Sequence, residues 1–396
     1  MRFSVVVSII FAIICIATDI VIYKKLHKHK KLRIAHTVIS TAIYLMLISV
    51  PIVLATGYTG THVMQYAMWA LFTCASVFLP KTFYAIFFIF SRIPLLFRKK
   101  PVKILSKIGI AIGYAMFAAI WWGALVTTHR IQVNEITVES QKIPEAFNGY
   151  RIAQFSDLHT GTFGDNTTVV RNMVNQMNAL KPDLIVFTGD IVNNSSSELL
   201  PFIDELKKMK ANDGVLSILG NHDYGDYKKW KSETDKQNNL ARLISLQRDS
   251  LEWDLLLNQH TYIKHGKDSL LIIGVENWGE PPFSTHGNLK AAMPSDNGYK
   301  GFKLLLSHNP KHWEMEIAGK TDIDLTLSGH THAMQMMISF GNKKYSPSSM
   351  RYKYWQGLYE DSRQQLYVNI GMGEVGIPMR IGATPEITVI TLKRKQ

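Results

Sequence analysis

Residues 151–159 read RIAQFSDLH, an apolar run that ends in an aspartate and a histidine two positions apart. Four later apolar runs end in the same way, with an oxygen or nitrogen donor close behind them. The five clusters are Ser156–His159 (SDLH), Gly189–Asp190 (GD), Gly220–Asp223 (GNHD), Ser307–Pro310 (SHNP) and Gly329–His332 (GHTH). Short apolar runs bounded by such polar residues are typical of buried strands. The pattern therefore predicts a sheet whose strands each deliver a metal-ligating side chain at one end.

The rest of residues 131–396 alternates between strand and helix patterns. Strand-like runs cover Arg151–Phe155, Leu184–Thr188, Val215–Leu219, Leu270–Val275, Lys303–Leu306, Leu325–Leu327 and Leu366–Ile370, and Ile131–Val138 reads as a strand with a phase slip. Helical patterns cover Val169–Leu180, Leu199–Met209 and Ser232–Leu257. Such alternation predicts an α/β layered fold. Donors at the carboxyl ends of strands lie where open α/β sheets build their sites.

The clusters offer two Asp, one Asn and four His, enough donors for two divalent ions that share one carboxylate. Asp157 and His159 are separated by one residue, and an extended segment points alternate side chains the same way. Asp190 follows a glycine that lets the backbone approach closely. Taken alone, the polar residue of any one cluster is more often a surface residue or a core residue with ordinary hydrogen bonds. Five in series predict a two-metal site, a device that attacks phosphate esters with ions about 3.5–4 Å apart.

Charge is distributed unevenly along the chain. Residues 1–130 hold 15 Lys and Arg against one acid, Asp19, whereas residues 131–396 hold 29 basic and 30 acidic residues. The basic excess lies between apolar runs and not on the predicted globular domain, which argues against nucleic acid as a partner. The two cysteines, Cys15 and Cys74, also lie in apolar runs and read as small buried hydrophobic residues.

Four apolar stretches precede residue 130: Phe3–Tyr23, Ile34–Thr56, Tyr66–Phe97 and Ile108–Thr127. Each is long enough to cross a bilayer, which takes about 20 residues. The joints 24–33 and 98–107 are rich in Lys and Arg, whereas the joint 57–65 has none. Because positive joints stay in the cytoplasm, four spans place residues 131–396 outside. A turn at Pro80 would make five spans and break this rule, so we expect one continuous third span.

The donor clusters resemble those of the calcineurin-like metallophosphoesterases over about residues 150–375, and most closely the membrane-anchored bacterial branch. The resemblance implies a layered β-sandwich flanked by helices, here behind a four-helix transmembrane region. It implies one ion held by Asp157, His159, Asp190 and His332, and a second held by Asp190, Asn221, His308 and His330. His222 matches the family's general acid, with Asp223 as its orienting partner. Many relatives have Gly-Gly-Gln after the last histidine, where this chain has Ala333-Met334-Gln335.

We therefore expect residues 1–130 to form a membrane anchor and residues 131–396 a metal-dependent phosphoesterase domain outside the cytoplasmic membrane. Hard oxygen donors with imidazole suit Mn, Fe or Zn, and a hydroxide between two such ions would attack phosphorus. Tyr224–Lys231, Trp278–His286 and the basic, aromatic Tyr345–Tyr359 are candidate substrate contacts, and a lipid-linked phosphate ester is one candidate substrate. Two alternatives stay open: a non-catalytic membrane sensor or scaffold, and a transporter with an accessory phosphoesterase domain.

Overall fold

The computed structural model describes residues 5–55, 61–280, 285–295, 298–341 and 343–396. The chain forms two compact units. Unit 1 comprises Met1–Val126 with Gly376–Met379, and unit 2 comprises Thr127–Val375 with Arg380–Gln396.

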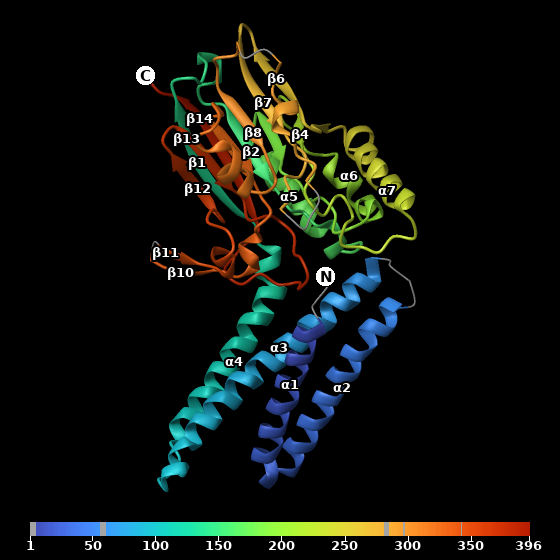
Figure 1. Ribbon diagram of the computed structural model, residues 1–396, viewed down its shortest axis with the longest axis vertical. Coiled ribbons are helices and arrows are strands. Elements are labelled where there is room, and N and C mark those ends of the chain that lie inside the picture. The colour runs from blue at the N-terminus through green and yellow to red at the C-terminus, as the bar shows by residue number, and fades with distance from the viewer. Residues whose placement is uncertain (1–4, 56–60, 281–284, 296–297, 342) are drawn as a thin grey trace. The chain divides into compact units, whose positions relative to one another are not determined.

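Unit 1 contains four long helices: α1 (Val5–Lys25), α2 (Lys30–Ala55), α3 (Thr61–Arg92) and α4 (Lys103–Leu125) (Figure 1). Segments Lys30–Val53, His62–Phe97 and Lys103–His129 are long and apolar enough to span a membrane. The predicted first stretch begins at Phe3 and the second ends at Thr56, so those two ends lie outside the described residues. The four-helix prediction is confirmed.

Helix α3 is continuous through Pro80, as the charge pattern predicted. It packs against α4, and the contact depends on two small residues of α4. A Cβ on Gly109 would lie 2.6 Å from the Cβ of Phe87, and one on Gly113 would lie 3.3 Å from the carbonyl oxygen of Pro80. Small residues four positions apart let helix backbones approach closely in membranes. The Gly109–Gly113 pair is a packing signal that the hydropathy pattern did not reveal.

A polar cluster lies among α1, α2 and α3. The Lys81 ammonium lies 3.2 Å from the Asp19 carboxylate and donates to Ser40 Oγ at 2.8 Å. Tyr44 donates to the other Asp19 oxygen at 2.8 Å, and His36 Nε2 lies 3.5 Å from Asp19. Charged groups within apolar helices are costly unless they pair. Here the two opposite charges pair and hold three helices together.

Unit 2 is built on two six-stranded sheets and one separate hairpin. The first sheet has the order β1 (Gln132–Ser140), β14 (Glu386–Arg394), β2 (Arg151–Phe155), β3 (Leu184–Phe187), β4 (Val215–Ser217) and β5 (Asp254–Leu255). The second has the order β12 (Gly357–Asp361), β13 (Gln364–Val368), β9 (Leu325–Ser328), β8 (Lys303–Leu306), β7 (Asp268–Gly274) and β6 (Gln259–His265). The hairpin pairs β10 (Ile338–Phe340) with β11 (Lys343–Tyr345).

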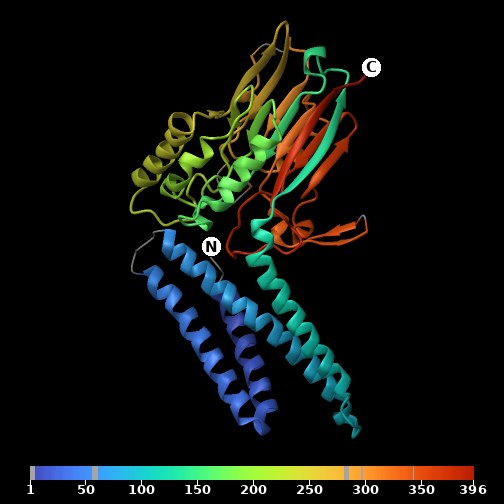
Figure 2. The same cartoon turned by 180° about the vertical axis from the view of Figure 1, so that it is seen from behind.

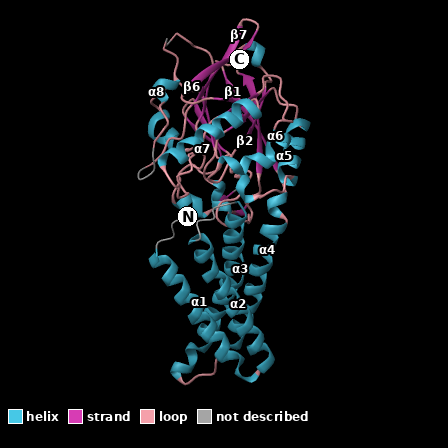
Figure 3. Ribbon diagram, turned by 90° about the vertical axis from the view of Figure 1, so that its right-hand side faces the viewer, coloured by secondary structure: helices cyan, strands magenta, loops and turns pink. Residues whose placement is uncertain are grey.

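The two sheets face each other across a shared core. Ile152 and Val186 from the first sheet share one buried cluster with Leu304 and Leu327 from the second. Successive side chains of a strand point to opposite faces. Ala153 and Phe187, next to Ile152 and Val186, therefore lie in a second buried cluster that includes residues of α5. Figure 3 shows helices on both sides of the strands. The predicted α/β layered sandwich with flanking helices is confirmed.

Three helices cover parts of unit 2: α5 (Thr168–Ala179), α7 (Glu233–Ser245) and the short α8 (Leu289–Ala292). Helix α5 buries Val170, Met173, Val174 and Met177 against the first sheet. The expected helix over 199–209 is instead a 3₁₀ segment followed by the four-residue α6 (Ile203–Leu206). The pattern over 232–257 also ends early, because the chain enters β5 at Asp254.

Strand β14 lies inside the first sheet, although the sequence pattern singled out no strand there. It pairs in parallel with β1 and antiparallel with β2, and Figure 2 shows β1 and β14 side by side in green and red. Strand β14 therefore joins the first strand of unit 2 to β2, the strand that Asp157 follows.

Candidate metal centre

The predicted ligands follow the carboxyl ends of five strands. Asp157 and His159 follow β2, Asp190 follows β3, Asn221 follows β4, His308 follows β8, and His330 and His332 follow β9. Strands β2, β3 and β4 are mutually parallel in one sheet, as are β8 and β9 in the other. Parallel strands end on the same edge of a sheet, so ligands 175 positions apart in the sequence meet at one edge of the sandwich.

The backbone at this edge is held in an uncommon conformation. Asp157, Asp190 and His330 have φ values of 51°, 63° and 75°, and His159 and His332 also lie in the left-handed region. Left-handed backbone costs a non-glycine residue about 1–2 kcal/mol, and such strain concentrates at functional sites. A Cβ on Gly329 would collide with Ser156 Oγ and Asp157 Oδ2. That glycine is needed for the two loops to approach.

Two groups of ligand atoms form at this edge, each with its atoms within 4.8 Å of one another. The first contains Asp157, His159 and His332. The Nε2 atoms of the two histidines lie 3.1 Å apart, and His332 Nε2 lies 3.2 Å from Asp157 Oδ1. All three side chains are buried.

The second group contains Asp190, His308 and His330, with Asn221 beside them. His308 Nε2 lies 3.1 Å from Asp190 Oδ2, 3.1 Å from Asn221 Oδ1 and 3.2 Å from His330 Nδ1. The same Asp190 Oδ2 lies 3.7 Å from His159 Nε2 of the first group. One carboxylate oxygen thus faces donors of both groups.

These separations fit metal ligation. Two donors about 2.1 Å from one cation are roughly 3.0–3.4 Å apart for angles between 90° and 109°, and the 3.1–3.2 Å distances given above lie in this range. Two unprotonated ring nitrogens 3.1 Å apart repel each other unless a proton or a cation lies between them. The donor set of carboxylate, amide and imidazole suits Mn, Fe or Zn, so the residues present fit the metals implied by the sequence.

Second contacts decide which ring nitrogen faces the centre. His308 Nδ1 donates to the Thr188 carbonyl at 2.7 Å, which leaves Nε2 free to bind a cation. His330 Nε2 lies 3.0 Å from the Tyr352 hydroxyl, and its Nδ1 faces His308. The buried Arg380 guanidinium lies 3.2 Å from His332 Nδ1. Because arginine only donates, His332 Nδ1 is the acceptor in this contact.

Charge and burial keep most of the candidate carboxylates and imidazoles unprotonated, so that their lone pairs are available to bind cations. Burial works to raise the pKa of both carboxyls, but His332 beside Asp157 and His308 beside Asp190 hold each pKa below its usual range. Burial lowers the pKa of His159, and burial together with His308 lowers that of His330 to about 3. Burial acts in the same direction on His308, but the Asp190 carboxylate raises its pKa to about 9. A cation at His308 must therefore displace a proton.

His222 lies at the centre, but Asp223 does not orient it. His222 Nδ1 donates to the Asn193 carbonyl at 2.7 Å, and its ring stacks on Tyr227 with centroids 4.3 Å apart. The Asp223 carboxylate instead accepts from the backbone amides of Asp190, Ile191, Val192 and Gly220 at 2.9–3.3 Å. The expectation that Asp223 orients His222 was wrong, because both Asp223 oxygens accept from backbone amides and His222 Nδ1 uses the Asn193 carbonyl. Asp223 ties the Asp190 loop to the Asn221 loop.

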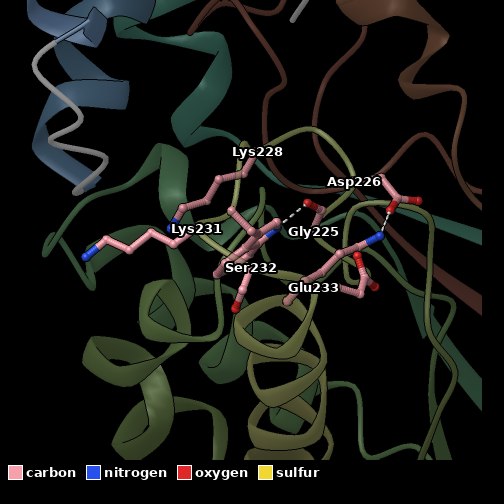
Figure 4. Close-up of a pocket in the computed structure, with 8 residues that line it drawn as sticks. Gly225, Asp226, Lys228, Lys231, Ser232 and Glu233 are labelled. Atoms are coloured by element: carbon pink, nitrogen blue, oxygen red, sulfur yellow. Dashed lines mark hydrogen bonds and ion pairs between the residues drawn. The ribbon is translucent and has the colours of Figure 1, made fainter.

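A pocket of about 400 Å³ opens on the loop that follows His222. It is lined by Gly225, Asp226, Lys228, Trp230, Lys231, Ser232, Glu233 and Lys236. Figure 4 shows Lys228 and Lys231 among the side chains around it, and Asp226 forms an ion pair with Lys236. Within this loop Tyr227 accepts from the Asn221 amide at 2.8 Å. Part of the predicted contact segment 224–231 therefore lies against a metal-ligand candidate, whereas residues 281–284 of segment 278–286 lie outside the described residues.

The Ala333-Met334-Gln335 departure has a structural consequence. All three residues adopt left-handed φ values of 45–59°, a conformation that glycine reaches without strain. Ala333 is buried in a cluster with Tyr352 and Trp355, and Met334 is exposed. Gln335 Oε1 accepts from the Val375 amide at 2.5 Å. The added Ala333 side chain therefore packs into a hydrophobic cluster.

Comparison with known proteins agrees with this geometry. A family model described as "Calcineurin-like phosphoesterase" matches residues 150–334. A second, described as "Probable Calcineurin-like phosphoesterase, transmembrane domain", matches residues 1–127. The "Uncharacterized metallophosphoesterase YkuE" of Bacillus subtilis is 34% identical over 70% of this chain and 95% of its own. The chain belongs to the calcineurin-like metallophosphoesterases.

Relatives in this family also occur in animals. The "Transmembrane protein with metallophosphoesterase domain" of Danio rerio is 29% identical over 66% of this chain, and the match spans 57% of that protein's length. Among solved structures, a metallophosphoesterase from Sphaerobacter thermophilus is 16% identical, with a TM-score of 0.28 over 57% of this chain and 78% of that one. The family implies divalent metal ions and phosphoesterase activity.

Several residues at the centre carried no signal in the sequence. Asn193 acts through its backbone carbonyl, and Arg380 lies 48 positions from the histidine that it contacts. Tyr352 stood within a predicted contact segment, but its pairing with His330 was not foreseen. None of the three follows an apolar run in the way the ligands do.

Proposed function

We propose that the protein is a binuclear metal-dependent phosphoesterase. Residues 1–130 serve as its membrane anchor, and residues 131–396 carry the chemistry on the extracytoplasmic side. Asp157, His159, Asp190 and His332 hold one ion, and Asp190, Asn221, His308 and His330 hold the other. The observation that carries this proposal is the position of Asp190 Oδ2, 3.1 Å from His308 Nε2 and 3.7 Å from His159 Nε2.

Two divalent cations, when bound, supply an activated water and neutralise charge on the phosphoryl oxygens. The residues of the chain do the rest. The Asn193 carbonyl fixes the hydrogen of His222 on Nδ1, so a second proton on this ring resides at Nε2. From Nε2 the ring can protonate the departing oxygen, and general acids of this kind contribute about 10²–10⁴-fold. Tyr227 stacks on the ring and limits its rotation.

A lipid-linked phosphate ester at the outer face of the membrane is the substrate class that we favour. The charge of the joints supports the outward orientation. Aromatic and basic side chains gather in residues 345–359, where Arg351 lies over the Tyr352 ring at 5.5 Å and Lys353 over the Tyr354 ring at 4.9 Å. Tyr352 also reaches His330, which connects this basic, aromatic segment to the centre.

The test is Asp190→Asn in the full-length protein in detergent, assayed for bound metal by mass spectrometry and for hydrolysis of para-nitrophenyl phosphate. Losing the charge that faces both groups should lower the metal content from two ions per chain and reduce turnover at least 100-fold. Asp204→Asn, an exposed aspartate away from the centre, is the matched control and should change neither. Full activity of Asp190→Asn would refute the proposal.

A further inference from the structure

The hairpin β10–β11 exposes an apolar face, and no other strand among the described residues pairs with it. It forms a sheet of its own, in the register Ile338↔Tyr345, Ser339↔Lys344 and Phe340↔Lys343. Paired residues share a face, so Ile338, Tyr345 and Phe340 lie together with Lys343 beside them. Their exposed fractions are 58%, 54% and 71%. An isolated two-stranded hairpin with such a face is at best marginally stable in water, which points to a partner.

The hairpin is held firmly to the metal centre at its base. The 3₁₀ turn His332–Gln335 starts at a candidate ligand, and β10 begins three residues after this turn, at Ile338. Met337 donates to the Ile381 carbonyl at 2.8 Å, and Ser346 Oγ donates to the Ala333 carbonyl at 2.6 Å. Whatever surface the hairpin contacts is therefore kept at a constant position relative to the histidine ligands.

The chemistry of the hairpin fits a lipid surface. Aromatic and aliphatic side chains beside lysines are typical of segments that lie in the bilayer interface. Lys343 lies on the apolar face and is exposed, so its charge is available to anionic head groups, whereas the exposed Lys344 lies on the opposite face. Two copies of this face would bring their Lys343 ammonium groups together, and this repulsion disfavours a self-association surface. The chain ends α4 at Leu125 and begins β1 at Gln132, so a short tether joins unit 2 to the bilayer.

We propose that the face formed by Ile338, Phe340 and Tyr345 inserts into the head-group layer of the membrane and presents lipid phosphate esters to the metal centre. The membrane contact stands on the exposed hairpin alone, whereas its role in presenting substrate rests on the proposed function. In this role the hairpin is the element through which the enzyme selects substrates within the membrane over soluble ones.

The membrane contact is tested by fluorescence in the full-length protein, reconstituted into vesicles of phosphatidylcholine and phosphatidylglycerol. The native cysteines are both buried, so an environment-sensitive NBD label can be attached to Phe340→Cys on the apolar face or to Ser339→Cys on the opposite face. The label at 340 should shift its emission to the blue and be quenched by lipids carrying a shallow doxyl group. Labels at both positions that stay equally aqueous and unquenched would overturn the contact.

The role in substrate selection is tested with Ile338→Ser/Phe340→Ser in the same vesicles, now containing phosphatidic acid or a polyprenyl diphosphate. The ratio of lipid hydrolysis to para-nitrophenyl phosphate hydrolysis should fall about ten-fold, through a higher apparent KM for the lipid. Met315→Ser, an exposed methionine elsewhere, should leave that ratio unchanged. An unchanged ratio in the double variant, or hydrolysis of the soluble ester without any lipid hydrolysis, overturns the role. Hydrolysis of neither ester by the wild type refutes the proposed function and leaves the fluorescence result standing.

Discussion

At the scale of the residue, the centre depends on carboxylates that do different work although they lie a few ångströms apart. Asp190 uses Oδ2 toward the histidines and Oδ1 to accept from the His222 amide at 2.8 Å. Asp223 uses both oxygens on backbone amides. In the proposed centre Asp190 offers its charge to cations, whereas Asp223 satisfies a loop that would otherwise bury unpaired N–H groups.

Because these residues have different roles, we expect His222→Asn and Asp223→Asn to have different effects on metal content and turnover. His222→Asn should keep its metal and lose about 10²–10⁴-fold in kcat, with a smaller loss for para-nitrophenyl phosphate than for an alkyl phosphate, whose leaving group needs a proton more. Asp223→Asn should instead lower the metal content and the thermal midpoint, because its amide group cannot accept from all four backbone donors. Metal analysis beside kinetics distinguishes them, and a metal-replete Asp223→Asn with only a shifted pH profile would contradict this account.

The burial of Glu198 leads us to expect that the stability of the protein depends on pH. Burial raises its pKa to about 7, while the backbone amides of Asn193 and Asn194 oppose the shift. A pKa raised on folding makes the folded state favour the protonated form. Its stabilising effect is therefore complete below the ordinary value of 4.5 and lost as the pH rises through about 7.

We expect thermal unfolding of the full-length protein to show a lower midpoint at pH 8 than at pH 5. Glu198→Gln should flatten this difference, since glutamine cannot ionise. At about 1.4 kcal/mol per pKa unit, the change in unfolding free energy is at most about 3 kcal/mol. Glu233→Gln, on the exposed first turn of α7, is the control. A pH profile identical in wild type and Glu198→Gln would rule out this source.

At the scale of the element, the helices of unit 1 are joined by charge as well as by close packing. Asp19 and Lys81 both have partners, and their charges cancel. A pair arranged in this way can act as an interhelical clamp, which is the role expected in an anchor. The same pair is the feature to examine for the transporter alternative, because buried ionisable groups mark transport paths.

Lys81→Met leaves the half-buried Asp19 carboxylate without its countercharge, and breaking one partner of a fully buried pair costs about 3–5 kcal/mol, which is the upper bound here. The double variant Asp19→Asn/Lys81→Met removes both charges and should recover most of that loss. Thermal midpoints of the detergent-purified protein measure both effects. A Lys81→Met variant as stable as the wild type would show that the pair does not hold α1 to α3.

At the scale of the whole molecule, the proposed orientation places the phosphoesterase domain outside the cytoplasm. A fusion of green fluorescent protein to Gln396 should be dark when the chain is exported unfolded, whereas a fusion of alkaline phosphatase at the same position should be active. The same reporters at residue 100, within the positive joint, should show the reverse pattern. Strong fluorescence from the Gln396 fusion would overturn the topology.

Much of the centre was predictable because its ligands directly follow buried strands. The spacing within Asp157-Leu158-His159 and His330-Thr331-His332 carries the chemistry locally, and apolar runs mark the strands with little interference from tertiary contacts. Strand β14 was not predicted, since its place between β1 and β2 depends on pairing partners more than 200 positions away. The expected helix over 199–209 is mostly replaced by a 3₁₀ segment, and α7 passes into a π-helical turn at Leu246–Ser250 before β5, changes that the local periodicity did not indicate.

The order of residues by itself predicted the family, the four apolar helices and a candidate donor set, because each of these depends on short segments whose chemistry does not require the remainder of the chain. Only the tertiary structure decided that Asp190 Oδ2 faces both histidine groups, that Asn193 and not Asp223 orients His222, and that Tyr352 and Arg380 position ligand rings. Those contacts join distant segments, and a side chain's partner across a fold depends on the packing of both sheets.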